Sequence, residues 1–261
     1  MTQSSQAVLA ERRGAVLLLR LNRPQQRNAL DADLLSALHA ELEAAHADAS
    51  LRCLVLSGAG KVFSAGADLK ALQGLQTASS EANKADSRRL AEVLHLLYSG
   101  PLPVVAAVEG AAVAGGAGLA SACDLVVAGE GARIGYTEVR LGFVAAIVMV
   151  FLLRCVGEKH ARELLLTGRL ISAVEAHRMG LINEVVPDGQ AETRALALAA
   201  EIAGNSATAL STTREMLSLL PGMGLEEGLR YAVGVNAWTR TTSDLKEGVA
   251  AFLEKREPQW R

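Results

Sequence analysis

Apolar residues follow two different periods along the first two-thirds of the chain. Short, continuous apolar runs predict strands that are covered on both faces; they lie at 15–21, 53–56, 104–108, 125–128, 134–136 and 181–186. Runs with helical spacing alternate with them; we expect helices at 31–47, 79–98, 144–156, 158–166 and 172–179. This alternation predicts an α/β fold.

The strand pattern ends after Pro187, and only helical patterns follow, at 190–203, 207–220, 225–240 and 243–254. We therefore expect an α/β body over residues 1–200 and a helical region over 201–261. One side of this region carries Leu225, Leu229 and Val233 at helical spacing. An apolar stripe of this kind is typical of a helix that packs on a neighbouring subunit.

Composition excludes several classes of protein. The net charge of −2 gives no electrostatic reason to expect nucleic acid or an anionic membrane as a partner. The longest apolar run, 143–153, is shorter than the roughly 20 residues that span a bilayer. The first residues lack the apolar core of a signal peptide, so we expect a cytoplasmic protein. Cys53, Cys123 and Cys155 are widely spaced, which favours buried free thiols over disulfides or a metal site.

The motifs that suggest nucleotide binding or nucleophilic catalysis are incomplete. Residues 58–61 read Gly-Ala-Gly-Lys, but Val62 stands where a phosphate-binding loop needs Ser or Thr. Around Gly116 the third glycine of a dinucleotide-binding turn is missing. No serine lies in a Gly-x-Ser-x-Gly motif, and the histidines lack metal-ligand spacing.

Two loops of small residues remain, at 64–68 and 114–118, and each follows a predicted strand. Unpaired N–H groups at the start of a helix can hold an anion or polarise a carbonyl. Close packing of a helix on a sheet is the alternative, because glycine serves both purposes. Glu138 is a candidate acid or base, although a carboxylate beside an arginine, here Arg140, usually forms a surface ion pair.

Three segments resemble the crotonase, or enoyl-CoA hydratase/isomerase, superfamily. They are FSAGADLK (63–70), EGAAVAGGAGLASACDLVVA (109–128) and GYTEVRLGF (135–143). Segments 21–30, 164–186 and 248–258 fit the same family in the same order, so the resemblance covers essentially the whole chain. It implies a spiral of ββα units that binds acyl-CoA, followed by a helical trimerisation region. It also implies assembly as a homotrimer or a dimer of trimers.

The resemblance also implies the members of the site. The N–H groups of Ala67 and Gly115 would form an oxyanion hole around a thioester carbonyl, and Glu138 would move a proton. The residues expected along the coenzyme A arm are Gln25, Arg27, Ala65, Asp68 and Leu69, with Lys70 near the phosphates and Phe252 and Lys255 contributed by an adjacent subunit. The family needs no permanently bound cofactor and no metal, because the substrate arrives as a coenzyme A thioester, as in fatty acid metabolism.

The chain departs from the family pattern in two places. Many hydratases of the family carry two catalytic glutamates; the second matches Glu138, but Gly118 stands at the position of the first. A glutamate at 118 would restore the pair if the pocket has room. After Gly142 the chain reads Phe-Val-Ala-Ala-Ile in place of an early Pro-Gly, which predicts a more apolar wall for the acyl pocket.

With one carboxylate, three functions stay open. A hydratase would add water across the 2,3 double bond of an enoyl-CoA. A Δ3–Δ2 enoyl-CoA isomerase needs only one base, which Glu138 could supply. A non-catalytic paralogue would keep the oxyanion hole only to bind acyl-CoA. The sequence does not specify the length or branching of the acyl chain.

Overall fold

A six-stranded sheet forms the centre of the body in this computed structural model, which describes residues 6–260. Its strands are β1 (Val8–Arg13), β2 (Val16–Leu21), β3 (Cys53–Gly58), β4 (Val104–Val108), β6 (Leu125–Gly129) and β9 (Glu184–Val186), in that spatial order. The β1–β2 pair is antiparallel, and every later pair is parallel. A smaller sheet pairs β5 (Ala111–Val113) with β7 (Arg133–Gly135) and β7 with β8 (Ile171–Ser172).

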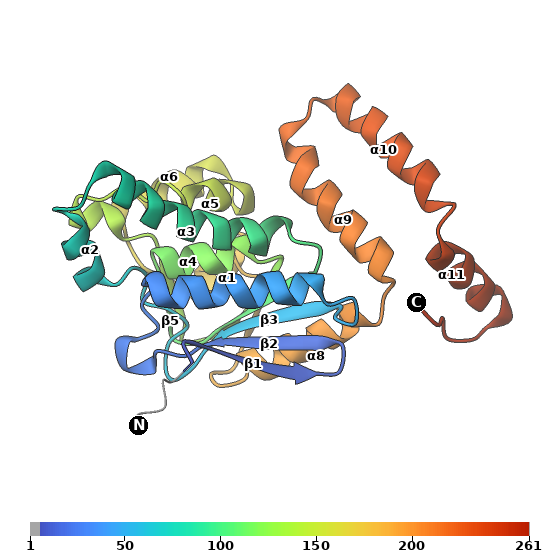
Figure 1. Cartoon of the computed structure of the whole chain (residues 1–261), viewed down its shortest axis with the longest axis horizontal. Helices are drawn as coiled ribbons and strands as arrows, with labels where there is room; N and C mark the ends of the chain where they lie inside the picture. Colours follow the sequence, from blue (N-terminus) through green and yellow to red (C-terminus); the bar gives the residue numbers. More distant parts are fainter. Residues whose placement is uncertain (1–5, 261) are drawn as a thin grey trace.

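Helices cover both faces of the large sheet (Figure 1). One face packs on α1 (Ala32–Ala47), α3 (Ser80–Ser99) and α4 (Gly115–Ala122), and the other packs on α8 (Ala191–Ala203). Side chains alternate along β3, with Leu54 and Leu56 in the first core and Cys53 and Val55 in the second. Burial on both faces explains why these strands read as continuous apolar runs.

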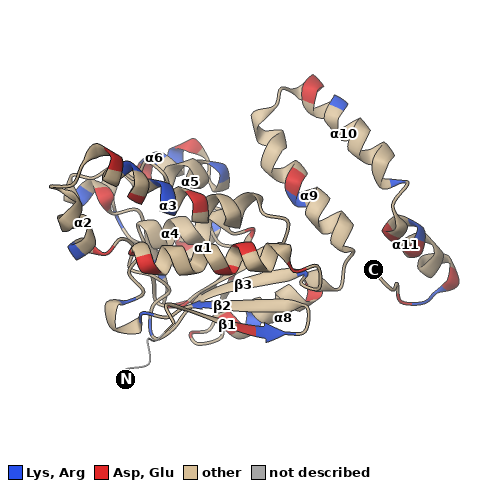
Figure 2. Ribbon diagram, in the orientation of Figure 1, with Lys and Arg blue, Asp and Glu red and all other residues tan. Residues whose placement is uncertain are grey.

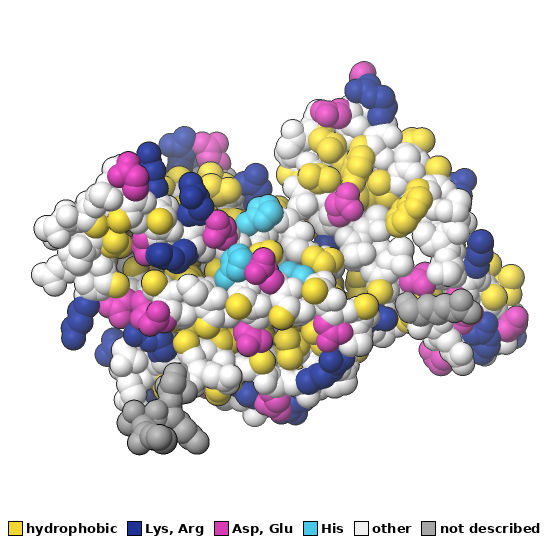
Figure 3. All heavy atoms as spheres, in the orientation of Figure 1, with side chains coloured by type: hydrophobic (Ala, Val, Ile, Leu, Met, Phe, Trp, Pro, Cys, Tyr) yellow, Lys and Arg dark blue, Asp and Glu magenta, His cyan; other side chains and the backbone are white. Residues whose placement is uncertain are grey.

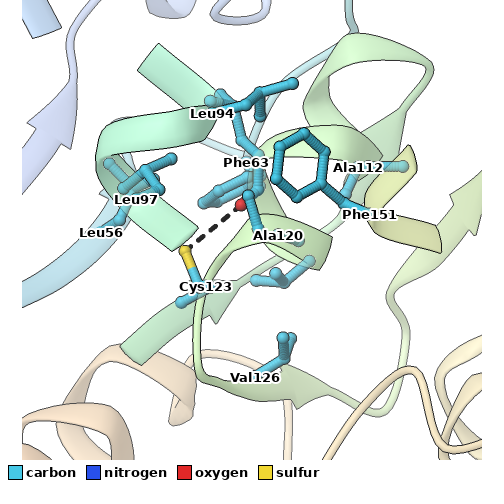
Figure 4. Packing of buried hydrophobic residues seen from close by; sticks show 14 of the residues in the cluster. Leu56, Phe63, Leu94, Leu97, Ala112, Ala120, Cys123, Val126 and Phe151 are labelled. Carbon is cyan, nitrogen blue, oxygen red and sulfur yellow. Dashed lines mark hydrogen bonds between the residues drawn. The ribbon is translucent and has the colours of Figure 1, made fainter. Parts of the chain in front are cut away.

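Phe63 lies at the centre of the larger core. Figure 4 shows Leu56 of β3, Leu94 of α3, Ala120 of α4 and Phe151 gathered around it. Phe63 itself is fully buried. Because Phe63 immediately precedes the first small-residue loop, its burial fixes where that loop begins.

The remaining helices complete the described chain. Short ones lie between the strands of the body, namely η1 (Pro24–Gln26), α2 (Leu69–Leu75), η2 (Glu138–Leu141), α5 (Met149–Cys155), α6 (Glu158–Thr167) and α7 (Ala173–Arg178). The helices after the body are α9 (Ala207–Leu219), η3 (Leu220–Gly222), α10 (Leu225–Thr239) and α11 (Ser243–Glu254). No helix between residues 6 and 260 combines the length and the apolar character needed to cross a bilayer.

Most of the expected elements are present, and the long ones match closely. The helix expected at 31–47 begins after Asp31, whose carboxylate accepts from the N–H of Leu34 at 2.9 Å. The prediction of a helix at 144–156 is wrong at its N-terminal end, since α5 begins only at Met149. Gly142 has φ of 71°, and the N–H of Phe143 bonds to the carbonyl of Glu138, so the chain is still turning there. The strand expected at 181–186 is confined to 184–186, and β1, β5, β8 and α2 were not expected.

Helices α9 to α11 extend away from the body (Figure 1), and α9 is anchored to it by a buried arginine. The guanidinium of Arg214 is 5% exposed and donates to Asp124 at 2.8 Å. It also donates to the carbonyls of Leu97, Gly100 and Leu102. These acceptors satisfy the buried cation and connect α9 to the end of α3 and to β4.

Helix α10 is uncharged over most of its length (Figure 2). Leu225 and Val233 on this helix are 80% and 68% exposed in the single chain. That exposure fits the predicted subunit contact, and the oligomeric role of residues 201–261 stays a prediction.

Replacing Arg214 with methionine should lower the free energy of unfolding by about 1–3 kcal/mol, because the carbonyls of Leu97, Gly100 and Leu102 would lose their buried donor and Asp124 would lose its counter-ion. Urea titration followed by circular dichroism measures the change. Lys159→Met is the matched control, because Lys159 is exposed and forms no ion pair among the described residues. A loss no larger than that of the control would contradict the anchoring role.

Candidate active site

Ala67 presents one backbone N–H group that the fold leaves free. Leu30 forms a parallel bridge with Ala67, in which the N–H of Leu30 donates to Gly66 at 2.8 Å. The N–H of Asp68 donates back to the carbonyl of Leu30 at 3.0 Å. Both bonds use the neighbours of Ala67, so its own N–H points away from Leu30. That N–H has no acceptor in the described part of the chain, and Ala67 is exposed.

Gly115 presents a second free N–H group at the start of α4. The N–H of Ala114, just before the helix, donates to Gly135 at 2.8 Å, and that of Gly118 donates to Ala114 at 3.0 Å. Between them, the N–H of Gly115 has no acceptor within residues 6–260. The first N–H groups of a helix have no partner inside it, and they lie at its positive end.

The two loops that carry these N–H groups are in direct contact. A Cβ atom at Gly66 would lie 2.6 Å from the carbonyl oxygen of Val113 and 3.3 Å from the nitrogen of Gly115. Only glycine fits this contact, and the φ of 85° at Gly66 also favours glycine. Ala114 has φ of 51°, an uncommon value for a residue with a side chain. Strain of this kind is concentrated at functional sites.

A buried asparagine and a buried serine hold the first loop in place. The side-chain amide of Asn28 donates to the carbonyls of Ala59 and Val62, each at 2.9 Å. The hydroxyl of Ser64 donates to the carbonyl of Asn28 at 2.8 Å and accepts from the N–H of Gly66. Neither role was predicted from the sequence. Ser64 directly follows the apolar Val62 and Phe63, which was a signal of a buried polar group, whereas Asn28 follows polar residues and gave no such signal.

Glu138 begins η2 with its carboxyl group buried. It is 8% exposed, and its Oε2 atom has no hydrogen-bond partner among the described residues. Burial raises the pKa of Glu138 above the usual range of a glutamate. No ion pair joins it to Arg140 in residues 6–260, so the surface ion-pair interpretation is wrong.

The fold holds the start of η2 close to α4. Gly135, which accepts from Ala114, precedes Glu138 in the same segment. The buried hydroxyl of Tyr136 is hydrogen-bonded to that of Ser121 on α4. Ser121 also donates to the carbonyl of Ala117 at 2.8 Å. The segment that leads to the carboxyl group is therefore tied to both ends of the helix that begins at Gly115.

The space beside Gly118 is filled by Val148. A Cβ atom at Gly118 would lie 2.9 Å from Cβ of Val148 and would overlap its Cγ1. Val148 is 3% exposed and precedes α5. A glutamate at 118 therefore has no room in this arrangement, contrary to the possibility left open by the sequence. No local signal could have shown this, because the two residues are distant in the chain.

The residues expected along the coenzyme A arm fall into two groups. Near the first loop, the N–H of Ala65 donates to the carbonyl of Arg27 at 3.0 Å, and exposed Gln25 lies beside it in η1. Asp68 caps α2 by accepting from the N–H of Lys70 at 3.0 Å, and Leu69 is 61% exposed. A backbone hydrogen bond thus joins Arg27 to Ala65, and Asp68 and Leu69 directly follow Ala67 in the chain.

Phe252 and Lys255 lie elsewhere, at the end of α11. Phe252 is 83% exposed, and Lys255 ends the helix with φ of 56°. Figure 1 shows α2 and α11 at opposite ends of the molecule. A single chain therefore does not bring these two residues to the site, and their contribution from an adjacent subunit stays a prediction.

Comparisons with known proteins agree with this geometry. Residues 11–261 match the sequence model of the enoyl-CoA hydratase/isomerase family. A putative enoyl-CoA hydratase of Thermus thermophilus is 52% identical over 248 residues, which cover 95% of this chain and 98% of the relative. The 2,3-dehydroadipyl-CoA hydratase of Escherichia coli is 37% identical, with 97% and 98% covered.

Solved structures give the same result for the fold. A putative enoyl-CoA hydratase/isomerase (crotonase) of Legionella pneumophila matches with a TM-score of 0.91 and 34% identity, covering 99% of this chain and 100% of that one. An enoyl-CoA hydratase of Mycobacterium smegmatis matches with a TM-score of 0.92 and 34% identity, covering 97% and 98%. The fold is that of the crotonase superfamily.

The chain belongs to the enoyl-CoA hydratase/isomerase family. It is accordingly an enzyme of the hydratase or isomerase kind, and its family acts on coenzyme A thioesters.

Gly118→Ala should lower the free energy of unfolding by about 1–3 kcal/mol, because the added methyl group overlaps Val148. Thermal unfolding followed by calorimetry measures the change. Gly74→Ala is the matched control, since nothing lies within 4 Å of a Cβ there and alanine favours a helix. In a Val148→Ala background the cost at position 118 should disappear. An equal cost in both backgrounds would contradict the proposed contact.

Proposed function

We propose that this enzyme is an enoyl-CoA hydratase, which adds water across the 2,3 double bond of an acyl-CoA thioester. The N–H groups of Ala67 and Gly115 bind the thioester oxygen. Glu138 delivers a proton to the α-carbon, and its carboxylate then takes up the proton that is lost by the water added at the β-carbon. The buried carboxyl group of Glu138, with its unpartnered Oε2 atom, is the observation that carries the proposal. The names of its relatives support hydration over isomerisation.

The chemistry requires both kinds of group. Attack at the β-carbon moves electrons towards the thioester oxygen, and two pre-set donors stabilise the charge that develops there. Each such donor contributes about 10²–10³ to the rate in measured cases. Burial favours the neutral form of Glu138, so the group keeps its proton to higher pH and can donate it to carbon.

The substrate arrives on coenzyme A, which we place along the surface that joins η1 to α2. Gln25, Arg27, Ala65, Asp68 and Leu69 line the arm, mostly through backbone atoms. Lys70 lies near the phosphates. Phe252 and Lys255 of an adjacent subunit complete the adenine and phosphate contacts in a homotrimer or a dimer of trimers, which the enzyme forms in the cytoplasm through residues 201–261. No bound cofactor takes part.

The Δ3–Δ2 enoyl-CoA isomerase is the second candidate, and the contact between Val148 and Gly118 favours it. An apolar side chain fills the position of a second carboxylate. A single base that carries a proton between two carbons is sufficient for isomerisation, whereas hydration must also hold a water molecule. Glu138 would act in both reactions.

A paired assay distinguishes the candidates. Purified enzyme should consume a short trans-2-enoyl-CoA, measured as loss of the absorbance of the conjugated thioester, and Glu138→Gln should lower kcat/KM by about 10²–10⁴. Turnover of a 3-enoyl-CoA without hydration would establish the isomerase instead. Inactivity on both thioesters, with binding retained, would indicate a non-catalytic acyl-CoA-binding protein.

The pH dependence of the same assay reports the role of Glu138. Hydration uses the protonated carboxyl group, so kcat/KM should fall as the pH rises through the raised pKa of the free enzyme. Isomerisation starts from the carboxylate, and its kcat/KM would rise over the same range. If kcat/KM neither falls nor rises over this pH range, Glu138 does not transfer a proton in the reaction.

A further inference from the structure

An open groove lies between α3 and the loop that precedes α5. It has a volume of about 770 Å³ and is lined by Ser80, Asn83, Lys84, Ser87, Arg88, Ala91 and Ile147. All but Ile147 come from α3, and most of them are polar. This lining differs from the apolar wall that the sequence predicts after Gly142.

The groove adjoins the acyl side of the proposed site. Ile147 in its wall directly precedes Val148, which packs on Gly118 of α4. Gly118 lies about one helical turn from Gly115, the proposed donor to the thioester oxygen. The residues proposed for the coenzyme A arm, by contrast, are on η1 and at the start of α2. An acyl chain that runs from the carbonyl past Gly118 and Val148 therefore has its far end in the groove.

Two cations in the groove have no counter-ion within residues 6–260. Lys84 and Arg88 are separated by four positions on α3, so they lie on the same face of the helix. Both are exposed, and neither forms an ion pair among the described residues. No Asp or Glu lines the groove. Arg89, the next residue, does have a partner, because it pairs with Asp86 at 3.6 Å.

Lys84 and Arg88 repel each other, and the described chain offsets this repulsion only in part. Like charges at this spacing destabilise an isolated helix by a few tenths of a kcal/mol. Figure 3 shows Lys and Arg side chains gathered over the α3 region of this face, with acidic side chains among them. The acidic residues of α3 are Glu81, Asp86 and Glu92, and none of them reaches ion-pair distance of Lys84 or Arg88. Glu81 lies three positions from Lys84 and Glu92 lies four positions from Arg88, so each offsets only a part of the repulsion. An anionic ligand group would relieve the repulsion.

We propose that the groove binds a carboxylate at the far end of the acyl chain, so that the preferred substrate is an enoyl-CoA derived from a dicarboxylic acid. Lys84 and Arg88 pair with the carboxylate, and Asn83 and Ser87, which line the same groove, donate hydrogen bonds to it. The proposal rests on the proposed hydratase function, because it assigns the acyl end of the same site. Coenzyme A phosphate is the other possible source of an anion, and the position of the groove beyond Val148 favours the acyl carboxylate.

The experiment compares medium-chain trans-2-enoyl-CoA substrates that end in a carboxylate with substrates of equal length that end in a methyl group. The ratio of their kcat/KM values should favour the carboxylate by about 2- to 30-fold, as expected for two exposed ion pairs. Lys84→Met/Arg88→Met should bring the ratio close to one, and added salt should reduce it in the native enzyme. The matched control is Arg89→Gln, outside the groove, which should leave the ratio unchanged.

Binding of the saturated thioesters, measured by calorimetry, tests the groove separately from the chemistry. Tighter binding of the carboxylate-ended thioester, lost in the double variant, supports the proposal. It does so even if the enzyme hydrates neither substrate, because the absence of hydration overturns only the hydratase function. Equal binding of the two thioesters by the native enzyme overturns the proposal while hydration of the methyl-ended substrate stands. If the double variant loses the same binding affinity for both thioesters, the two cations bind coenzyme A phosphate, and this result also overturns the proposal.

Discussion

The contact between the backbones of two loops is the constraint on which the site depends. Gly66 lies against Val113 and Gly115 so closely that no Cβ atom fits between them. This contact requires small residues on both sides, which explains the run from Gly110 to Gly118. It also leaves the N–H groups of Ala67 and Gly115 without acceptors in the described protein. Backbone N–H groups that a sheet or a helix would normally satisfy are thus left free.

The carboxyl group of Glu138 depends on the same arrangement. Strand β7 pairs with β5, and the carbonyl of Gly135 accepts the N–H that precedes Gly115. The bond between Tyr136 and Ser121 then fixes the next turn. Because the chain enters η2 from this anchored strand, the carboxyl group is buried, and its Oε2 atom has no hydrogen-bond partner among the described residues. Its raised pKa follows from burial and not from a charged neighbour.

Sequence periodicity predicted the long elements, because burial on one or both faces leaves a pattern over many residues. It missed β1, whose Glu and Arg residues interrupt the pattern of an edge strand, and β5 and β8, which are too short to show one. The site loops and Glu138 could be predicted from small residues and from the family resemblance. The contact of Val148 with Gly118 and the groove beside α3 could not, since each joins segments that are distant in the chain.

The central claim is that the N–H groups of Ala67 and Gly115 polarise a thioester carbonyl. Infrared difference spectroscopy of a saturated acyl-CoA, labelled with ¹³C at the carbonyl carbon, measures this polarisation without turnover. Two hydrogen bonds to the oxygen weaken the C=O bond, so the account predicts that the carbonyl band moves to lower frequency when the thioester binds. A band at the same frequency in the bound and free thioester would contradict it.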